Sequence, residues 1–180
     1  TINDFRPFFM PDKEKSHFGI HDAFISAARI IDAQLQESGI VLNITEVENI
    51  TIEGFENEFS QVILNILSNA KDAISQNSSS DERSLLFAKT SMDASNIYLE
   101  VFDSGGGISS DVLPCIFEPN FTTKHKMQGM GIGLYMAKQI IEKHMGGEIH
   151  AINHSFTYQN RNYTGAKFTL SLPKGESLES

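Results

Sequence analysis

The sequence predicts a two-layer α/β sandwich, in which one mixed, mostly antiparallel sheet carries about three helices on one face. Two observations predict it. Three amphipathic segments with helical periodicity are interspersed with short segments rich in β-branched and aromatic residues. The 180 residues, of which 40% are hydrophobic and 21% charged, suffice for one domain with its own core. Helices mixed with strands in this order are typical of a sheet covered by helices.

Three helices are predicted from the spacing of apolar residues. The first runs from about His21 to Glu37 and ends before Gly39. The strongest pattern runs from Glu56 to Gln76, where the apolar residues form one continuous stripe. This stripe comprises Phe59, Val62, Ile63, Ile66, Leu67, Ala70, Ala73 and Ile74. The third helix runs from about Gly131 to His144 and is capped by the glycines at 146–147.

Strands are predicted where extended-chain residues lie between turn signals. The segments are residues 40–44, 51–52, 84–92, 95–103, 148–153 and 166–172. A short apolar piece at 113–117 and a polar loop at 120–128 separate the fourth strand segment from the third helix.

The first residues differ from the rest of the chain. Apolar residues recur at helical spacing in TINDFRPFF before Pro11 and the charged run DKEK break the pattern. We therefore predict the end of a helix at residues 1–15, the main domain at 16–175 and a flexible tail at 176–180.

Charge and cysteine content exclude several classes of protein. The net charge of -9, with no basic patch, gives the chain no electrostatic reason to bind nucleic acid. The single cysteine, Cys115, excludes a disulfide framework, and its apolar surroundings VLPCIF predict a packed side chain. The apolar runs are too short to span a membrane.

Polar side chains flank the apolar stripe of the strongest predicted helix. Asn65 and Asn69 lie one turn apart, and at 100° per residue Glu58 and Asp72 fall on the same flank. Carboxamide oxygens can bind Mg²⁺ without repelling a triphosphate. The plain alternative is a polar helix edge.

A glycine-rich loop, DSGGGI, follows a predicted strand at Asp103 to Ile108. Glycines allow a tight turn and a close approach to a ligand. A carboxylate at a strand end can accept a hydrogen bond from an exocyclic amine such as that of adenine. A turn with a solvated aspartate is the alternative for this segment.

Two further segments suit phosphate. IFEPNFTTK carries threonine hydroxyls and a lysine, whereas Phe117 and Phe121 are more typical of a core. GMGIGL, residues 129–134, leads into a predicted helix and presents backbone N–H groups to anions. It is neither a dinucleotide fingerprint nor a P-loop, because no strand immediately precedes it and G-K-[ST] is absent.

The four patterns in this order resemble the family that unites histidine kinases, DNA gyrase, heat-shock ATPase chaperones and mismatch-repair ATPases. QVILNILSNAKDAI is similar to the N box, VFDSGGGI to the first glycine box, IFEPNFTTK to the F box, and GMGIGLYMAKQIIEKHMGGEI to the second glycine box. The resemblance covers roughly residues 18–173 and implies the Bergerat ATP-binding fold.

The histidine kinase branch is favoured by the F box with FTTK, by the helix MAKQIIEKHMGGEI and by the opening TINDFRPFFMPDKEK, which resembles the end of a dimerization and phosphoacceptor helix. Gyrase-like ATPases carry a water-activating Glu at the position of Asn65, and a carboxamide cannot act as that base. The resemblance thus implies a kinase that hands the γ-phosphate of Mg-ATP to a histidine.

The resemblance also implies site residues. Asn65 and Asn69 would be catalytic, with Asn69 holding Mg²⁺, and Asp103 would read the adenine amine. Residues from about 120 to 128 would form a mobile lid. The full ATP-binding set is Asn69, Asp72, Asp103, Gly105, Gly107, Ile108, Phe117, Thr122, Thr123, Lys124, Gly129, Met130, Gly131, Ile132, Gly133 and Leu134. Asp72 departs from the Lys or Arg of many sensor kinases, which leaves phosphate charge to Mg²⁺ and to Lys124 or Lys126.

The resemblance further implies partners: an upstream dimerization and phosphoacceptor domain, a response regulator, and a homodimeric full-length protein. The domain is expected in the cytoplasm, with an inner-membrane anchor on the intact protein as an open alternative. None of the six histidines lies in a helical H-E/D-x-x-x-P context, so this chain is expected not to phosphorylate itself. The histidines are His17, His21, His125, His144, His150 and His154.

Three other readings stay open at the level of sequence. An anti-sigma-factor serine kinase shares the boxes but lacks the FRPFF helix end. A gyrase-type hydrolase is disfavoured by Asn65. A degenerate domain that binds nucleotide only to regulate partners is disfavoured by the intact boxes.

Overall fold

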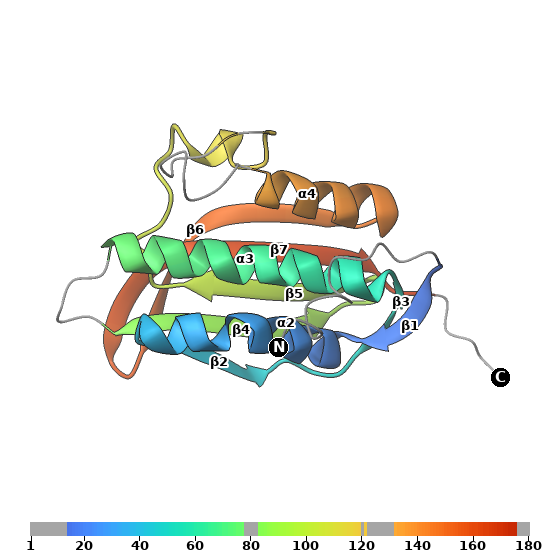
Figure 1. Ribbon diagram of the computed structural model, residues 1–180, viewed down its shortest axis with the longest axis horizontal. Helices are drawn as coiled ribbons and strands as arrows, with labels where there is room; N and C mark the ends of the chain where they lie inside the picture. The colour runs from blue at the N-terminus through green and yellow to red at the C-terminus, as the bar shows by residue number, and fades with distance from the viewer. Residues whose placement is uncertain (1–13, 78–82, 120, 122–131, 176–180) are drawn as a thin grey trace.

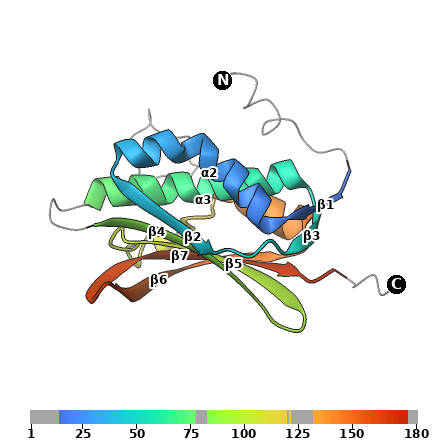
Figure 2. The same cartoon turned by 90° about the horizontal axis from the view of Figure 1, so that it is seen from below.

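A computed structural model describes residues 14–77, 83–119, 121 and 132–175 of the chain. In these ranges the fold has two layers, with helices packed on one face of a twisted sheet (Figures 1 and 2). The predicted α/β sandwich is confirmed. The predicted helix end at 1–15, the tail at 176–180 and most of the polar loop at 120–128 lie outside the described residues.

The first helix lies at the edge of the helical layer. α2 (Ile20–Glu37) follows the short strand β1 (Ser16–Gly19), which pairs antiparallel with β3 (Thr51–Gly54) in a separate two-stranded sheet. α2 buries seven residues of its apolar face and is followed by its C-cap Ser38 and by Gly39, which has a φ of +66°. Glycine is favoured directly after a helix because, without a Cβ, it adopts the left-handed conformation without steric strain.

The central helix is α3 (Glu56–Asn77), one residue longer than predicted. The apolar stripe is buried, with Phe59, Val62, Ile63 and Leu67 fully inaccessible to solvent. It packs on the sheet between α2 and the third helix, labelled α4 (Gly133–Gln139), so that its polar flank lies beside that helix (Figure 1). Burial of this stripe, rather than intrinsic propensity, stabilises a helix of this composition.

The main sheet has the order β2-β4-β5-β7-β6. β2 (Ile40–Glu46) pairs parallel with β4 (Ser84–Met92), and all other neighbours are antiparallel. β5 (Asn96–Asp103) is central and alternates buried with half-buried residues along its whole length. Asp103 therefore ends a strand in the middle of the sheet, on the face covered by helices.

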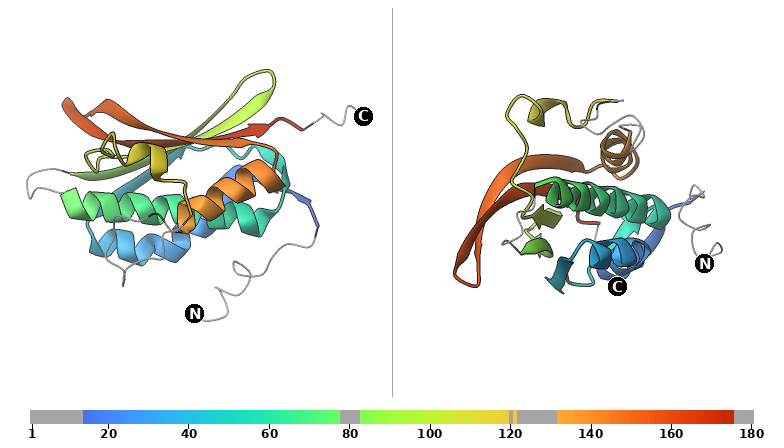
Figure 3. Two further views of the ribbon diagram at one scale, coloured as in Figure 1. Left: turned by 90° about the horizontal axis from the view of Figure 1, so that it is seen from above. Right: turned by 60° about the vertical axis from the view of Figure 1, so that its left-hand side comes forward.

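The last two strands are longer than predicted. β6 (Glu148–Tyr158) and β7 (Arg161–Pro173) form a hairpin that extends beyond the rest of the sheet as a curved ribbon in both views of Figure 3. The turn residues Gln159 and Asn160 have φ values of 47° and 62°. Two left-handed residues match the twist of a two-residue hairpin. Because no glycine lies at these positions, the turn could not be recognised from a local pattern.

The third helix is divided into two parts. The described part of the third helix consists of α4 (Gly133–Gln139) and the π-helical turn η2 (Ile140–His144) that follows it. A one-turn helix, η1 (Leu113–Cys115), precedes it in the predicted short apolar piece. In the described ranges, no helix combines the length and the apolar character that a membrane crossing requires.

Candidate functional site

Two asparagines on the polar flank of α3 make different contacts. Asn65 Nδ2 donates to Gly133 O at 3.0 Å, and Asn65 Oδ1 accepts from Gln61 Nε2 at 3.1 Å. Asn69 Nδ2 donates to Asn65 O at 2.8 Å, one helical turn back. The Asn65 carboxamide thus joins α3 to the first residue of α4, and the orientation of the Asn69 carboxamide is fixed at its nitrogen end.

Asp103 is a buried carboxylate at the end of β5, only 2% exposed. Its Oδ1 accepts hydrogen bonds from Gly105 N at 2.8 Å and from Ala166 N at 3.2 Å. Burial raises the pKa of Asp103, and the two backbone hydrogen bonds oppose that rise. Since both bonds go to Oδ1, Oδ2 is left to accept from a ligand as far as the described residues show.

Glycines surround Asp103 because no side chain fits there. A Cβ on Gly105 would lie 3.0 Å from backbone atoms of Ala73 and Ile74 in α3. A Cβ on Gly165 would lie 1.6 Å from Asp103 O, a direct collision with backbone. Gly165 was missed by sequence reasoning. Its requirement arises across two neighbouring strands and leaves no local pattern.

The glycine loop after Asp103 forms hydrogen bonds with side chains and backbone of other elements. Asn77, the last residue of α3, donates to Gly105 O at 2.9 Å, and Gly106 N donates to Thr164 O at 2.9 Å. Asn153 of β6 exchanges two hydrogen bonds with the backbone of Ile108. Sequence reasoning singled out neither asparagine, because both act through contacts distant in sequence.

The F box phenylalanines pack on the core. Phe117 lies edge-on to Phe168 at a centroid distance of 6.3 Å, and Lys138 Nζ lies 5.7 Å from the centre of its ring. Phe121 is also half-buried against the core. Phe117 therefore packs on β7 and lies close to Lys138 of α4. Cys115, predicted to be packed, is half-buried.

The predicted phosphate segments are described only in part. Thr122, Thr123, Lys124, Gly129, Met130 and Gly131 lie outside the described residues. Ile132 is 38% exposed, whereas Leu134 packs against the core. The start of α4 is therefore described only from Gly133 onward, where Asn65 holds it.

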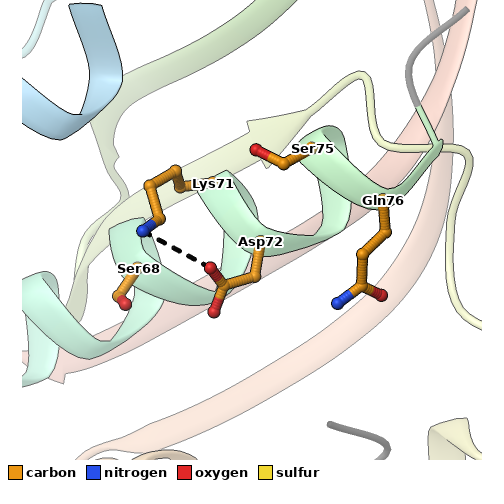
Figure 4. A pocket seen from close by; sticks show the side chains of 5 residues that line it. All are labelled: Ser68, Lys71, Asp72, Ser75 and Gln76. Atoms are coloured by element: carbon orange, nitrogen blue, oxygen red, sulfur yellow. Dashed lines mark ion pairs between the residues drawn. The ribbon is translucent and has the colours of Figure 1, made fainter. Parts of the chain in front are cut away.

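A polar depression of about 400 Å³ lies on the outer side of α3. Figure 4 shows its lining residues: Ser68, Lys71, Asp72, Ser75 and Gln76. Lys71 Nζ lies 3.5 Å from Asp72 Oδ1 and donates to Gln34 Oε1 of α2 at 2.9 Å. The charge of Asp72 is thus partly balanced by a neighbouring lysine.

His144 has a structural contact. Its Nδ1 lies 2.7 Å from Glu58 Oε2, and its ring lies edge-on to Phe55. Glu58, from the polar flank of α3, therefore attaches the end of the third helix, as Asn65 attaches its beginning.

The structure brings the predicted residues together around α3. Gly105, which donates to Asp103, lies against its C-terminal half, and Gly133 lies against Asn65. In the ranges that the structure describes, no His, Cys, Asp and Glu side chains cluster as a metal site, so a cation here would depend on carboxamide oxygens and on oxygens of a ligand. The two-layer sandwich thus carries a buried strand-end carboxylate, a glycine loop and an asparagine-bearing helix, the segments on which the resemblance to the ATPase family rests.

A sequence profile of the histidine kinase-, DNA gyrase B- and HSP90-like ATPases matches residues 54–176, and the chain belongs to this family. The two-component sensor PprA of Pseudomonas aeruginosa is 30% identical over 165 residues, which make up 91% of this chain and 17% of that protein. The sensor protein FixL of Bradyrhizobium diazoefficiens is 35% identical over 119 residues, 66% of this chain and 21% of that protein. The chain therefore spans a minor part of the length of these relatives.

Solved structures agree on the fold. The catalytic domain of histidine kinase ThkA has a TM-score of 0.72 at 24% identity and covers 89% of this chain and 98% of that one. The mycobacterial sensor histidine kinase MprB has a TM-score of 0.68 at 21% identity, with 88% and 96% covered. The relatives and the fold together identify a catalytic ATP-binding domain of the sensor histidine kinase type.

Proposed function

We propose that this domain binds Mg-ATP and transfers its γ-phosphoryl group to a histidine on a dimerization domain, for relay to an aspartate of a response regulator. The observation that carries the proposal is the buried Asp103, whose Oδ1 is saturated by backbone N–H groups. The remaining oxygen suits a ligand that presents an N–H donor, as the exocyclic amine of adenine does.

The glycine loop supports the same assignment. Gly105 approaches the backbone of α3 so closely that a Cβ would lie 3.0 Å from Ala73 and Ile74. In the proposed complex, Gly107 and Ile108 would line the base, and the backbone of Gly133 and Leu134 at the start of α4 would face the phosphates.

Asn69 would hold Mg²⁺, with Asn65 in support, and the metal would neutralise charge on the phosphates. Thr122, Thr123 and Lys124 would contact phosphate from the lid. Asp72 would remain beside Lys71 as a rim residue of the site.

The transfer itself needs no base on this domain. The P–O bond to the β-phosphate breaks, a P–N bond to the imidazole forms, and ADP leaves. Asn65 is a carboxamide engaged with Gly133 and Gln61, and it cannot take a proton from water. Hydrolysis is therefore expected to be slow compared with transfer.

The partners follow from the relatives. PprA is named as a two-component sensor, and one solved structure is of ThkA in complex with the response regulator protein TrrA. For this chain we propose an upstream dimerization domain, a homodimeric full-length protein and a response regulator as phosphate acceptor.

Calorimetric titration with a non-hydrolysable ATP analogue, with and without Mg²⁺, tests the proposal. Binding in the micromolar range is expected, lost in Asp103→Ala and weakened in Asn69→Ala only when Mg²⁺ is present. Asn162→Ala, at an exposed asparagine beside the turn of the β6–β7 hairpin, is the matched control. If the unmutated chain does not bind the ATP analogue, the proposal is wrong and the regulatory-module alternative is favoured.

A second assay separates kinase from hydrolase. Incubated alone with labelled ATP, the chain is expected to acquire no acid-labile phosphate. A supplied dimerization domain should acquire it. Rapid release of inorganic phosphate by the chain alone would favour the gyrase-type reading.

A further inference from the structure

Asn153 of β6 pairs with the backbone of one residue in the glycine loop. Ile108 N donates to Asn153 Oδ1 at 2.7 Å, and Asn153 Nδ2 donates to Ile108 O at 2.7 Å. A single carboxamide thus satisfies both the donor and the acceptor of one residue, as a neighbouring strand would. The two residues are 45 positions apart in sequence.

The preceding glycine is shaped for this contact. Gly107 has a φ of +87°, a conformation that side chains disfavour. A Cβ on Gly107 would lie 2.8 Å from Asn153 Oδ1 and would push the carboxamide away. The third glycine of DSGGGI and the asparagine of β6 are therefore complementary to each other.

The two halves of the glycine loop are held by different partners. Gly105 and Gly106 are held by Asn77 and by the backbone of Thr164. In the part of the chain that the structure describes, the hydrogen bonds to the Gly107–Ile108 half come from Asn153. The Asn153 side chain is itself exposed, so it buries little surface that would stabilise the fold as a whole.

We infer that Asn153 is a positioning residue for the nucleotide site: it fixes Gly107 and Ile108 in the conformation that the base requires. The inference rests on the proposed function. Ordering this half of the loop before binding removes an entropic cost that the nucleotide would otherwise meet. Loss of Asn153 should therefore weaken nucleotide binding far more than it weakens folding.

Three variants test this assignment. Asn153→Ala removes both hydrogen bonds, whereas Asn153→Asp keeps an acceptor for Ile108 N and places a negative charge against Ile108 O. Asn162→Ala is the matched control, because Asn162 is an exposed asparagine on the same hairpin whose carboxamide contacts Thr157 at 2.8 Å. For each chain, we would measure the Kd of ADP and of a non-hydrolysable ATP analogue, the Tm, and the hydrogen exchange rate of the Ile108 amide.

The expected results separate positioning from general stability. Asn153→Ala should raise the Kd of both nucleotides by the same factor, about tenfold for the loss of two hydrogen bonds. Exchange of the Ile108 amide should become faster. The Tm of Asn153→Ala should stay within about 2 °C of that of Asn162→Ala. Asn153→Asp should weaken binding as well, because its second oxygen cannot donate to Ile108 O.

Two results would overturn the inference. Wild-type affinity in Asn153→Ala would show that the loop needs no such contact, while the proposed function would stand. An equal loss of affinity in Asn162→Ala would assign the effect to the hairpin rather than to Asn153. Failure of the unmutated chain to bind either nucleotide is a different result, and it would remove the proposed function together with the site.

Discussion

The side chain of Asn65 donates a hydrogen bond to Gly133 O at 3.0 Å and so joins two helices whose contacting residues are 68 positions apart. Asn65 lies in the middle of α3, and Gly133 is the first residue of α4. The bond places the start of α4 beside the polar flank of α3. The same carboxamide therefore links two segments that the sequence patterns assign separately to metal and to phosphate.

Replacing Asn65 should loosen α4 before it unfolds the domain. In Asn65→Asp the donor to Gly133 O is lost and a negative oxygen faces that carbonyl. We expect a loss of about 1–2 kcal/mol in the free energy of unfolding, together with weaker nucleotide binding. Urea denaturation and calorimetric titration would measure both. Unchanged stability in Asn65→Asp would mean that the Gly133 contact contributes nothing to the attachment of α4.

Replacing Gly165, which is buried in β7, should be far more damaging than adding a single methyl group usually is. In Gly165→Ala the Cβ would collide with Asp103 O, which is backbone in the central strand and cannot move alone. We expect the free energy of unfolding to fall by about 3 kcal/mol, or the variant not to fold at all. Gly175→Ala, which meets no atom within 4 Å, is the control and should be neutral. Thermal unfolding of both variants is the measurement. A Gly165→Ala variant as stable as the unmutated chain would contradict this packing.

The pH dependence of stability should reveal Asp103. Burial raises its folded-state pKa above the unfolded value. The folded state therefore binds the proton more tightly than the unfolded state does. This stabilising contribution is fully present at pH values below the unfolded-state pKa of Asp103. It is lost as pH rises through the folded pKa. Asp103→Asn cannot ionise, and it keeps an acceptor for Gly105 N and Ala166 N.

The measurement is the Tm of Asp103→Asn minus that of the wild type, taken from acidic to neutral pH. This difference should grow as pH rises, because only the wild type loses stability on ionisation of this group. Nucleotide affinity should fall at least about tenfold in the same variant, since an amide nitrogen replaces an acceptor. A difference in Tm that shrinks toward neutral pH would contradict the raised pKa.

The hairpin turn offers a stabilising change. Asn160 has a φ of 62°, and glycine adopts this region at no steric cost. Asn160→Gly should therefore raise the free energy of unfolding by about 0.5 kcal/mol, without affecting nucleotide binding beside Asp103. Chemical denaturation is the measurement, with Gln159 left unchanged to preserve its contact with Arg83. A loss of stability would mean that the Asn160 side chain itself supports the turn.

The helices and the inner strands could be predicted because their patterns are local. The apolar stripe of α3 has helical periodicity, and it was predicted to within one residue of its observed end. The alternation in β5 is similarly visible from Asn96 to Asp103. The outer hairpin was predicted too short, since its exposed strands carry polar residues and its turn lacks glycine. β1 was missed because four residues, half of them polar, carry no periodic signal.

The sequence by itself determined the fold class, the family and the segments that could meet a nucleotide, because stripes of apolar residues and ordered glycine boxes are written in contiguous stretches. Only the tertiary structure decided which atoms hold those segments in place. Gly165 excludes a side chain beside Asp103, Asn153 pairs with Ile108, and Asn65 reaches Gly133. Each of these depends on distances of 3 Å or less between residues far apart in the chain. Such proximity arises from the packing of strands and helices, and no local pattern encodes it.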